Sequence, residues 1–262
     1  MPRDGEVHAI TCGISLLTNA ARSHLAGEFD LGIPDEVARG IANPRKTEEA
    51  LSSLGPDKRQ GLRERLLKYA ETDPRRASAE LNALAGYLQT RGLDLERASE
   101  LIAEVLLLAS DTVSGSLAAG ALADFLRERG LVVSVHSIRG FQSGDYDLAL
   151  GNLKATVQSL VERHGDVLLN LTGGFKAEVA ALSVLAAESG LRAYYIHESS
   201  REVVFLPTGP ELKVRTTKEE KLLALLTVLL AVPFDSILGF PWFLIPTASL
   251  AFAAAWLAVK RV

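Results

Sequence analysis

The sequence predicts an α/β fold in which a Rossmann-like, mostly parallel sheet carries helices on both faces and a helical insertion, followed by a C-terminal transmembrane helical hairpin. Two observations predict it. Short apolar runs alternate with helix-like segments from residue 104 onward, and residues 222–258 contain a single charge, Asp235. Alternating strands and helices favour a parallel sheet with right-handed crossovers.

Each short apolar run is expected to form a buried strand, and the segments between these runs are expected to form helices. The first run ends at Gly13, which is typical of a strand that turns into a helix. The expected strands are residues 7–12, 105–109, 132–137 and 167–171, the expected helices are residues 15–26, 116–129, 146–163 and 175–188, and residues 192–197 and 202–206 are expected to close the domain as a hairpin.

Residues 34–89 interrupt this alternation. They are polar and charged, rich in Arg, Glu, Leu and Ala, and contain no β-branched runs. This composition favours helices joined by turns at Pro44, Pro56 and Pro74. We interpret the segment as a helical insertion.

Charge and cysteine content restrict the possible partners. The chain has 28 Lys and Arg against 32 Asp and Glu, a net charge of −4, which argues against binding to long nucleic acid. An anionic ligand therefore needs a local positive site.

The only cysteine, Cys12, excludes an intrachain disulfide and fits a reducing compartment. The first residues lack the features of a secretory signal, so the ligand domain is expected in the cytoplasm.

The apolar C-terminal stretch is expected to cross a membrane twice. A bilayer core of ~30 Å needs about 20 helical residues, and prolines and a glycine between Pro233 and Pro241 offer a turn. Basic residues stand before and after the stretch, so the positive-inside rule places both hairpin ends in the cytoplasm of a cell-membrane protein. The expected division is residues 1–208 for the ligand domain, 209–220 for a linker and 221–262 for the hairpin. A hydrophobic dimerisation hairpin, or a single span over residues 237–259, are the alternatives.

The loop after the first strand reads Gly13-Ile14-Ser15-Leu16-Leu17-Thr18-Asn19. Backbone N–H groups at a helix start favour a phosphate, and Ser15 offers a hydroxyl. The alternative is that Ser15 only caps the helix.

A second loop reads Asn170-Leu171-Thr172-Gly173-Gly174-Phe175-Lys176, again at a strand end. Paired glycines let the backbone approach a phosphate, and Lys176 supplies a charge. The alternative is a glycine turn beside a solvated lysine.

A third loop begins at Ser110, where Asp111 and Thr112 could contact ribose or adenine edges; a turn or helix cap is the alternative. Walker, dinucleotide, α/β-hydrolase and histidine-based metal fingerprints are all missing, so no cofactor and no metal are implied.

Four short motifs together resemble one family. They are G-x-S-L-L-T-N from Gly13, S-A-E-L-N-A-L at residues 78–84, S-D-T at residues 110–112 and L-T-G-G-F-K at residues 171–176. In this order they are similar to the CRISPR-associated Rossmann-fold (CARF) sensor domains of type III CRISPR systems, over roughly residues 7–206.

The resemblance implies a homodimer, or a higher oligomer, whose two-fold axis suits a cyclic oligoadenylate, most often cyclic tetra-adenylate. It implies ligand contacts at Gly13, Ile14, Ser15, Leu16, Thr18, Asn19, Asp111, Thr112, Thr172, Gly173, Gly174, Phe175 and Lys176. Some members cleave the ring without metal, and Ser15 and Lys176 match the residues that would then be catalytic. Ile14 stands where the family often has threonine, which removes one hydroxyl from the pocket.

The expected function is that of a cyclic oligoadenylate sensor and membrane effector in antiviral defence. A membrane-anchored ring nuclease that ends the signal is the alternative. A transcriptional regulator is disfavoured, because no DNA-binding helix-turn-helix follows residue 206 and the balance of charge is acidic.

Overall fold

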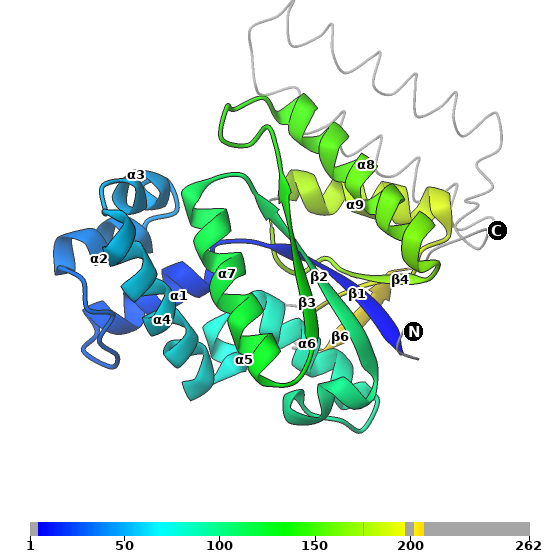
Figure 1. Ribbon diagram of the computed structural model, residues 1–262, viewed down its shortest axis with the longest axis horizontal. Helices are drawn as coiled ribbons and strands as arrows, with labels where there is room; N and C mark the ends of the chain where they lie inside the picture. Colours follow the sequence, from blue (N-terminus) through cyan, green and yellow to red (C-terminus); the bar gives the residue numbers. More distant parts are fainter. Residues whose placement is uncertain (1–4, 175, 197–201, 207–262) are drawn as a thin grey trace, which may run out of the picture. The chain divides into compact units, whose positions relative to one another are not determined.

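Six strands form one sheet in the computed structural model, which describes residues 5–174, 176–196 and 202–206 (Figure 1). Neighbouring strands are parallel, except that the last two pair antiparallel, and the order is β3-β2-β1-β4-β5-β6. This is the strand order of the Rossmann fold, so the predicted fold class of the ligand domain is confirmed. The strands are β1 (Glu6–Cys12), β2 (Ile102–Ser110), β3 (Val132–Ile138), β4 (Val167–Asn170), β5 (Ala193–Ile196) and β6 (Val203–Leu206).

Helices cover both faces of the sheet because the central strands are apolar on both sides. Ile10 of β1 packs with α1 (Ser15–Leu25), α6 (Ala79–Thr90) and α7 (Val113–Glu128). The neighbouring Ala9 packs against the opposite layer, α8 (Tyr146–His164) and α9 (Lys176–Ser189). Figure 1 shows α8 and α9 together on one side of the sheet and α7 on the other.

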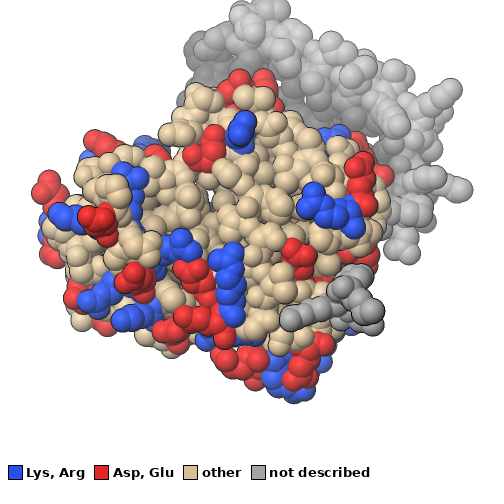
Figure 2. Space-filling model, viewed as in Figure 1, with Lys and Arg blue, Asp and Glu red and all other residues tan. Residues whose placement is uncertain are grey.

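The predicted helical insertion is confirmed, and it lies within the first crossover, between α1 and β2. It contains α2 (Asp35–Ala42), α3 (Thr47–Ser52), α4 (Pro56–Thr72), α5 (Pro74–Ala77) and α6, and the short 3₁₀ helix η1 (Leu95–Glu100) follows it. Pro56 and Pro74 are the first residues of helices rather than turn residues. At that position proline loses no hydrogen bond, because the N–H it lacks would have no partner within the helix. On the face in Figure 2, acidic and basic side chains are interspersed over this part of the molecule.

Two element boundaries differ from the predicted ones by three residues. The strand β2 begins at Ile102, three residues before the expected start, because its pairing with β1 extends down to Glu6. The helix α7 begins at Val113 rather than at residue 116, since the side chain of Thr112 caps it by accepting a hydrogen bond from Gly115 N at 3.0 Å.

The predicted transmembrane hairpin and its linker, residues 209–262, lie outside the described residues. Among the residues that are described, no helix is both long and apolar enough to span a bilayer. The hairpin therefore stays a prediction from the sequence.

A buried polar cluster ties the start of β1 to α6 and β5. The imidazole of His8 is fully buried; its Nε2–H donates to Glu6 Oε2 at 3.1 Å, which leaves Nδ1 as the acceptor for the Tyr194 hydroxyl at 3.4 Å. The Tyr87 hydroxyl also donates to Glu6, at 2.6 Å. The hydrogen bond from His8, helped by that of Tyr87, lowers the pKa of Glu6 to about 2, while burial lowers the pKa of His8. At neutral pH these two shifts favour an ionised carboxylate beside a neutral imidazole.

This cluster predicts an acid-sensitive fold. The folded-state pKa of Glu6 lies below its ordinary value of 4.5, so its contribution to stability is full above pH 4.5 and is lost as the pH falls toward 2. Replacing it by E6Q should lower the free energy of unfolding at pH 7 by up to about 3 kcal/mol and flatten its pH dependence between pH 4.5 and 2. Thermal unfolding against pH measures this; E100Q, at an exposed pair with Arg97, is the control and should change little. An unchanged acid limb in E6Q would contradict the assignment.

Candidate functional site

The carboxyl ends of β1 and β4 meet at the point where the strand order reverses. The chain leaves β1 toward β2 on one side, and β4 is added on the other side of β1. Crevices at such switch points are where open α/β sheets bind ligands. The first and second predicted loops follow these two strands, so the fold brings them together. A Cβ on Gly13 would lie 2.8 Å from Gly174 N, which explains why a glycine is needed there.

A buried glutamate of α6 holds the first loop. The side chain of Glu80, 2% exposed, accepts hydrogen bonds from Gly13 N at 2.7 Å and from the Ser15 hydroxyl at 2.9 Å. The Ser15 oxygen also accepts from Ala79 N, at 3.0 Å. The hydroxyl of Ser15 thus faces α6 and, like Gly13 N, is engaged within the protein.

The second loop is held by β1 and by the last residue of β4. Thr11 Oγ1 donates to Gly173 O at 2.7 Å, and Asn170 Oδ1 accepts from Thr172 N at 3.1 Å. The Asn170 amide also donates to the backbone oxygen of Glu80, at 3.3 Å. A Cβ on Gly173 would collide with the Glu80 carboxylate and the Thr11 carbonyl. Gly174 has φ +88°, a conformation that favours glycine.

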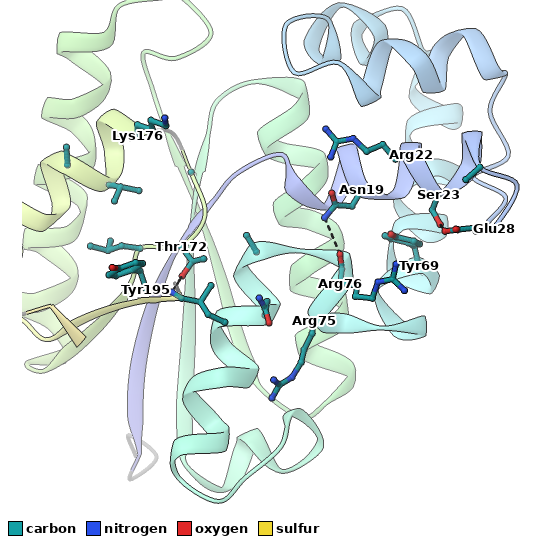
Figure 3. Close-up of a pocket in the computed structure, with 18 residues that line it drawn as sticks. Asn19, Arg22, Ser23, Glu28, Tyr69, Arg75, Arg76, Thr172, Lys176 and Tyr195 are labelled. Carbon is teal, nitrogen blue, oxygen red and sulfur yellow. Dashed lines mark hydrogen bonds between the residues drawn. The ribbon is translucent and has the colours of Figure 1, made fainter. Parts of the chain in front are cut away.

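A pocket of about 1210 Å³ opens beside the second loop (Figure 3). One wall is formed by the second loop, the start of α9 and the end of β5, and the other by α1, α4, α5 and α6. In Figure 3, Lys176 lies on one side of the pocket and Arg22 and Arg76 on the other. The lining residues are Asn19, Arg22, Ser23, Ala26, Glu28, Tyr69, Arg75, Arg76, Ala79, Asn82, Leu171, Thr172, Gly174, Lys176, Val179, Ala180, Tyr195 and Ile196.

The pocket carries a marked excess of positive charge. Four cationic side chains and one carboxylate, that of Glu28, line it. Among the described residues, none of the four cations forms an ion pair; Arg75 donates to Gln89 Oε1 at 2.9 Å and to Ala85 O at 3.3 Å instead. Burial raises the pKa of the Tyr69 phenol, which keeps its proton available as a donor. The wall can therefore receive an anion with several oxygens.

The side chain of Asn19 in α1 holds α5, the short helix that carries Arg75 and Arg76. Its Nδ2 donates to the backbone oxygens of Arg76 and Ala77, both at 3.2 Å. The position of α5, and with it that of the Arg76 guanidinium, is thereby set by α1, the helix that follows the first loop. Asn19 lines the pocket, but its amide nitrogen is engaged with α5.

The third loop lies apart from this pocket. Asp111 accepts from Gly140 N at 3.0 Å and Gln142 N at 2.8 Å, and Thr112 caps α7. Both residues line a separate, smaller pocket of about 420 Å³ together with Arg59 and Arg63. The structure thus brings the first two predicted loops together and leaves the third at another place.

The predicted ligand contacts of the first two loops fall into three groups. Asn19, Thr172, Gly174 and Lys176 line the large pocket. Phe175 lies outside the described residues. The remaining first-loop and second-loop positions do not line it, because they are turned toward the protein interior: Leu16 is fully buried, Thr18 donates to Ser15 O at 3.2 Å, and the others are Gly13, Ile14, Ser15 and Gly173.

Sequence reasoning missed Glu80 and the basic wall of Arg22, Arg75 and Arg76. Glu80 stands in the S-A-E-L-N-A-L motif, and a charged residue among apolar positions of a helix was the available signal. No sequence motif marks the three arginines as ligand contacts, because they come from α1 and α5 and line the same pocket as Lys176 only in the folded chain.

Comparison with known families shows which family this chain is similar to. The model of a family described as CRISPR-associated protein (Cas_APE2256) matches residues 75–209, slightly more than half of the chain. The matched part begins at the basic wall in α5 and includes Glu80, the second loop and β2 to β6. It leaves out β1 and the first loop.

The close packing behind the second loop predicts that Gly173→Ala is destabilising. Its Cβ would press on the buried Glu80 carboxylate and on a backbone oxygen, neither of which can move freely, so we expect a loss of about 1–3 kcal/mol in the free energy of unfolding. Denaturant unfolding of the full chain measures it. Gly151→Ala in α8, where a Cβ meets open space, is the matched control and should be neutral or slightly stabilising. Equal behaviour of the two variants would contradict the packing described.

Proposed function

This chain belongs to the Cas_APE2256 family of CRISPR-associated proteins, and we propose that it serves CRISPR defence by binding a cyclic oligoadenylate, in the first place cyclic tetra-adenylate, in the pocket beside the second loop. The observation that carries the proposal is the set of cations on opposite walls of that pocket. Arg22, Arg76 and Lys176 are exposed and have no carboxylate partner among the described residues, on a chain whose net charge is −4.

The size and the lining of the pocket support a ligand of several nucleotides. A pocket of about 1210 Å³ exceeds the ~300–1,000 Å³ that is usual for small-molecule sites. Tyr69 and Tyr195 lie on its walls, and aromatic rings are the usual stacking partners of unpaired bases. Cations on two walls can contact phosphates that are far apart in one ligand, as the phosphates of a ring are.

The proposed assembly is a homodimer. A cyclic tetra-adenylate has two-fold symmetry, so two copies of this pocket related by a two-fold axis would contact its phosphates equivalently. A higher oligomer that contains this dimer is compatible with the same ligand.

The proposed output is at a membrane. Residues 222–258, outside the described part of the chain, contain only Asp235 as a charged residue, and basic residues flank them on both sides. Ligand binding would act on these segments only if one arrangement of the ligand domains binds the ring better than the other. The ligand domain and both ends of the hairpin are proposed to lie on the cytoplasmic side.

A ring nuclease is the second candidate, and the place of Lys176 favours it. In that reaction a ribose 2′-oxygen attacks the adjacent phosphorus, the bond from phosphorus to the 5′-oxygen breaks, and the proton lost by the 2′-hydroxyl is balanced by protonation of the 5′-oxygen. The products are a 2′,3′-cyclic phosphate and a 5′-hydroxyl. Lys176 would stabilise charge on the phosphorane. Ser15, the other catalytic candidate, faces Glu80 instead of the pocket, so binding is better supported than cleavage.

The proposal predicts that both walls contribute to affinity. Lys176→Ala and Arg76→Ala should each weaken binding of labelled cyclic tetra-adenylate to the full-length chain by about ten- to a hundredfold, the usual effect of losing one hydrogen bond to a charged group. Lys154→Ala is the control, because Lys154 pairs with Glu188 on α8 and α9 outside the pocket. Equilibrium binding with product analysis measures affinity and cleavage together. Wild-type affinity in both pocket variants would refute this site.

The membrane proposal predicts the behaviour of the expressed chain on fractionation. Two apolar spans should carry the full-length protein into the membrane pellet, and release should require detergent rather than high salt or carbonate. Recovery of the folded protein from the supernatant without detergent would overturn it.

A further inference from the structure

The carboxylate of Glu80 stands where the first loop would otherwise receive an anion. It is 2% exposed, and its two oxygens accept from Gly13 N at 2.7 Å and Ser15 Oγ at 2.9 Å. No cationic side chain among the described residues forms an ion pair with it. A buried carboxylate without a counter-ion depends on such donors for its stability.

A second glutamate of the insertion does the same at the third loop. Glu48 of α3 accepts from Val113 N at 2.8 Å and Ser114 N at 2.9 Å, the first amides of α7. The insertion thus supplies a carboxylate to each of two loops at the carboxyl edge of the sheet. The second loop faces the pocket with Lys176 and Gly174.

The charge of Glu80 also lies close to the pocket. The space that a Cβ of Gly173 would fill is occupied by its carboxylate, and Gly174, the next residue, lines the pocket. Burial raises the pKa of the neighbouring Cys12 thiol, and the charges of Glu80 and Glu178 raise it further. A phosphate at the second loop would therefore be bound against the field of this carboxylate.

We propose that Glu80 is a resident anion which accepts from Gly13 N and the Ser15 hydroxyl in place of a ligand phosphate, and that it is thereby a positioning residue that sets the affinity of the pocket for its anionic ligand. As far as the ligand is concerned, this rests on the function proposed above. Ser15 then acts by holding Glu80, while Lys176 and the second loop contact phosphate.

The variant E80Q removes the negative charge of residue 80 and keeps the size and shape of its side chain. The amide oxygen can still accept from Gly13 N, but the amide NH₂ then faces Ser15 Oγ, so the serine must accept and its hydroxyl proton becomes free to turn outward. Loss of the buried charge favours an anion in the pocket. A gain in affinity cannot arise from damage to the fold.

The test is equilibrium binding of labelled cyclic tetra-adenylate to full-length wild type, E80Q, E48Q and the double variant S15A/E80Q. We expect E80Q to bind at least about threefold more tightly, as loss of a nearby like charge requires. E48Q, the same change at the third loop, should match wild type, and S15A/E80Q should keep the gain of E80Q, because Ser15 does not line the pocket. Unchanged or weaker binding by E80Q, or an equal gain in E48Q, would overturn the proposal.

If wild type and all variants fail to bind the ring, the proposed function is refuted, but the role of Glu80 is not. A second measurement then tests the resident-anion assignment. The variant E80A leaves the Gly13 and Ser15 donors without their acceptor, so its unfolding temperature should fall, and added formate should restore it by taking the vacated position. Formate should leave wild type and E80Q unchanged. No recovery of E80A with formate would then overturn the resident-anion assignment.

Discussion

Hydrogen bonds from backbone amides to two carboxylates of the insertion hold the carboxyl edge of the sheet together. The first loop is tied to α6 through Glu80, and α7 is tied to α3 through Glu48. An amide at a helix start that is shielded from water must find an acceptor. Because the chain provides these acceptors itself, the insertion is a structural part of the candidate site and not an appendage to it.

The three loops at the carboxyl edge of the sheet therefore have different roles. In the first loop Gly13 N and the Ser15 hydroxyl donate to Glu80, and in the third loop the first amides of α7 donate to Glu48. The loop that follows β4 presents Gly174 and Lys176 to the pocket. The same segment of chain that brings Glu80 also brings Arg75 and Arg76, only a few residues earlier. An acidic chain can in this way concentrate positive charge in one place, where it acts on a small anionic ligand without attracting long nucleic acid.

The alternation of strands and helices was predictable because each strand is a short apolar run, such as residues 167–170, that ends at a turn residue. The pairing of the first two loops was predictable from the rule for switch points. The direction of Ser15 was not, since it depends on Glu80, which is 65 residues away along the chain. Nor does a sequence indicate that Arg22 and Arg76 face Lys176, because this results from the path of the insertion. The hairpin over residues 221–262 remains a prediction from hydropathy.

The most direct measurement is a structure of the full-length chain with cyclic tetra-adenylate bound. The account predicts a phosphate within hydrogen-bond distance of Lys176 Nζ and the amide of the Gly174 turn, with Glu80 still bonded to Gly13 N and Ser15 Oγ. A phosphate seated on Gly13 N and Ser15 Oγ, with Glu80 displaced, would contradict it.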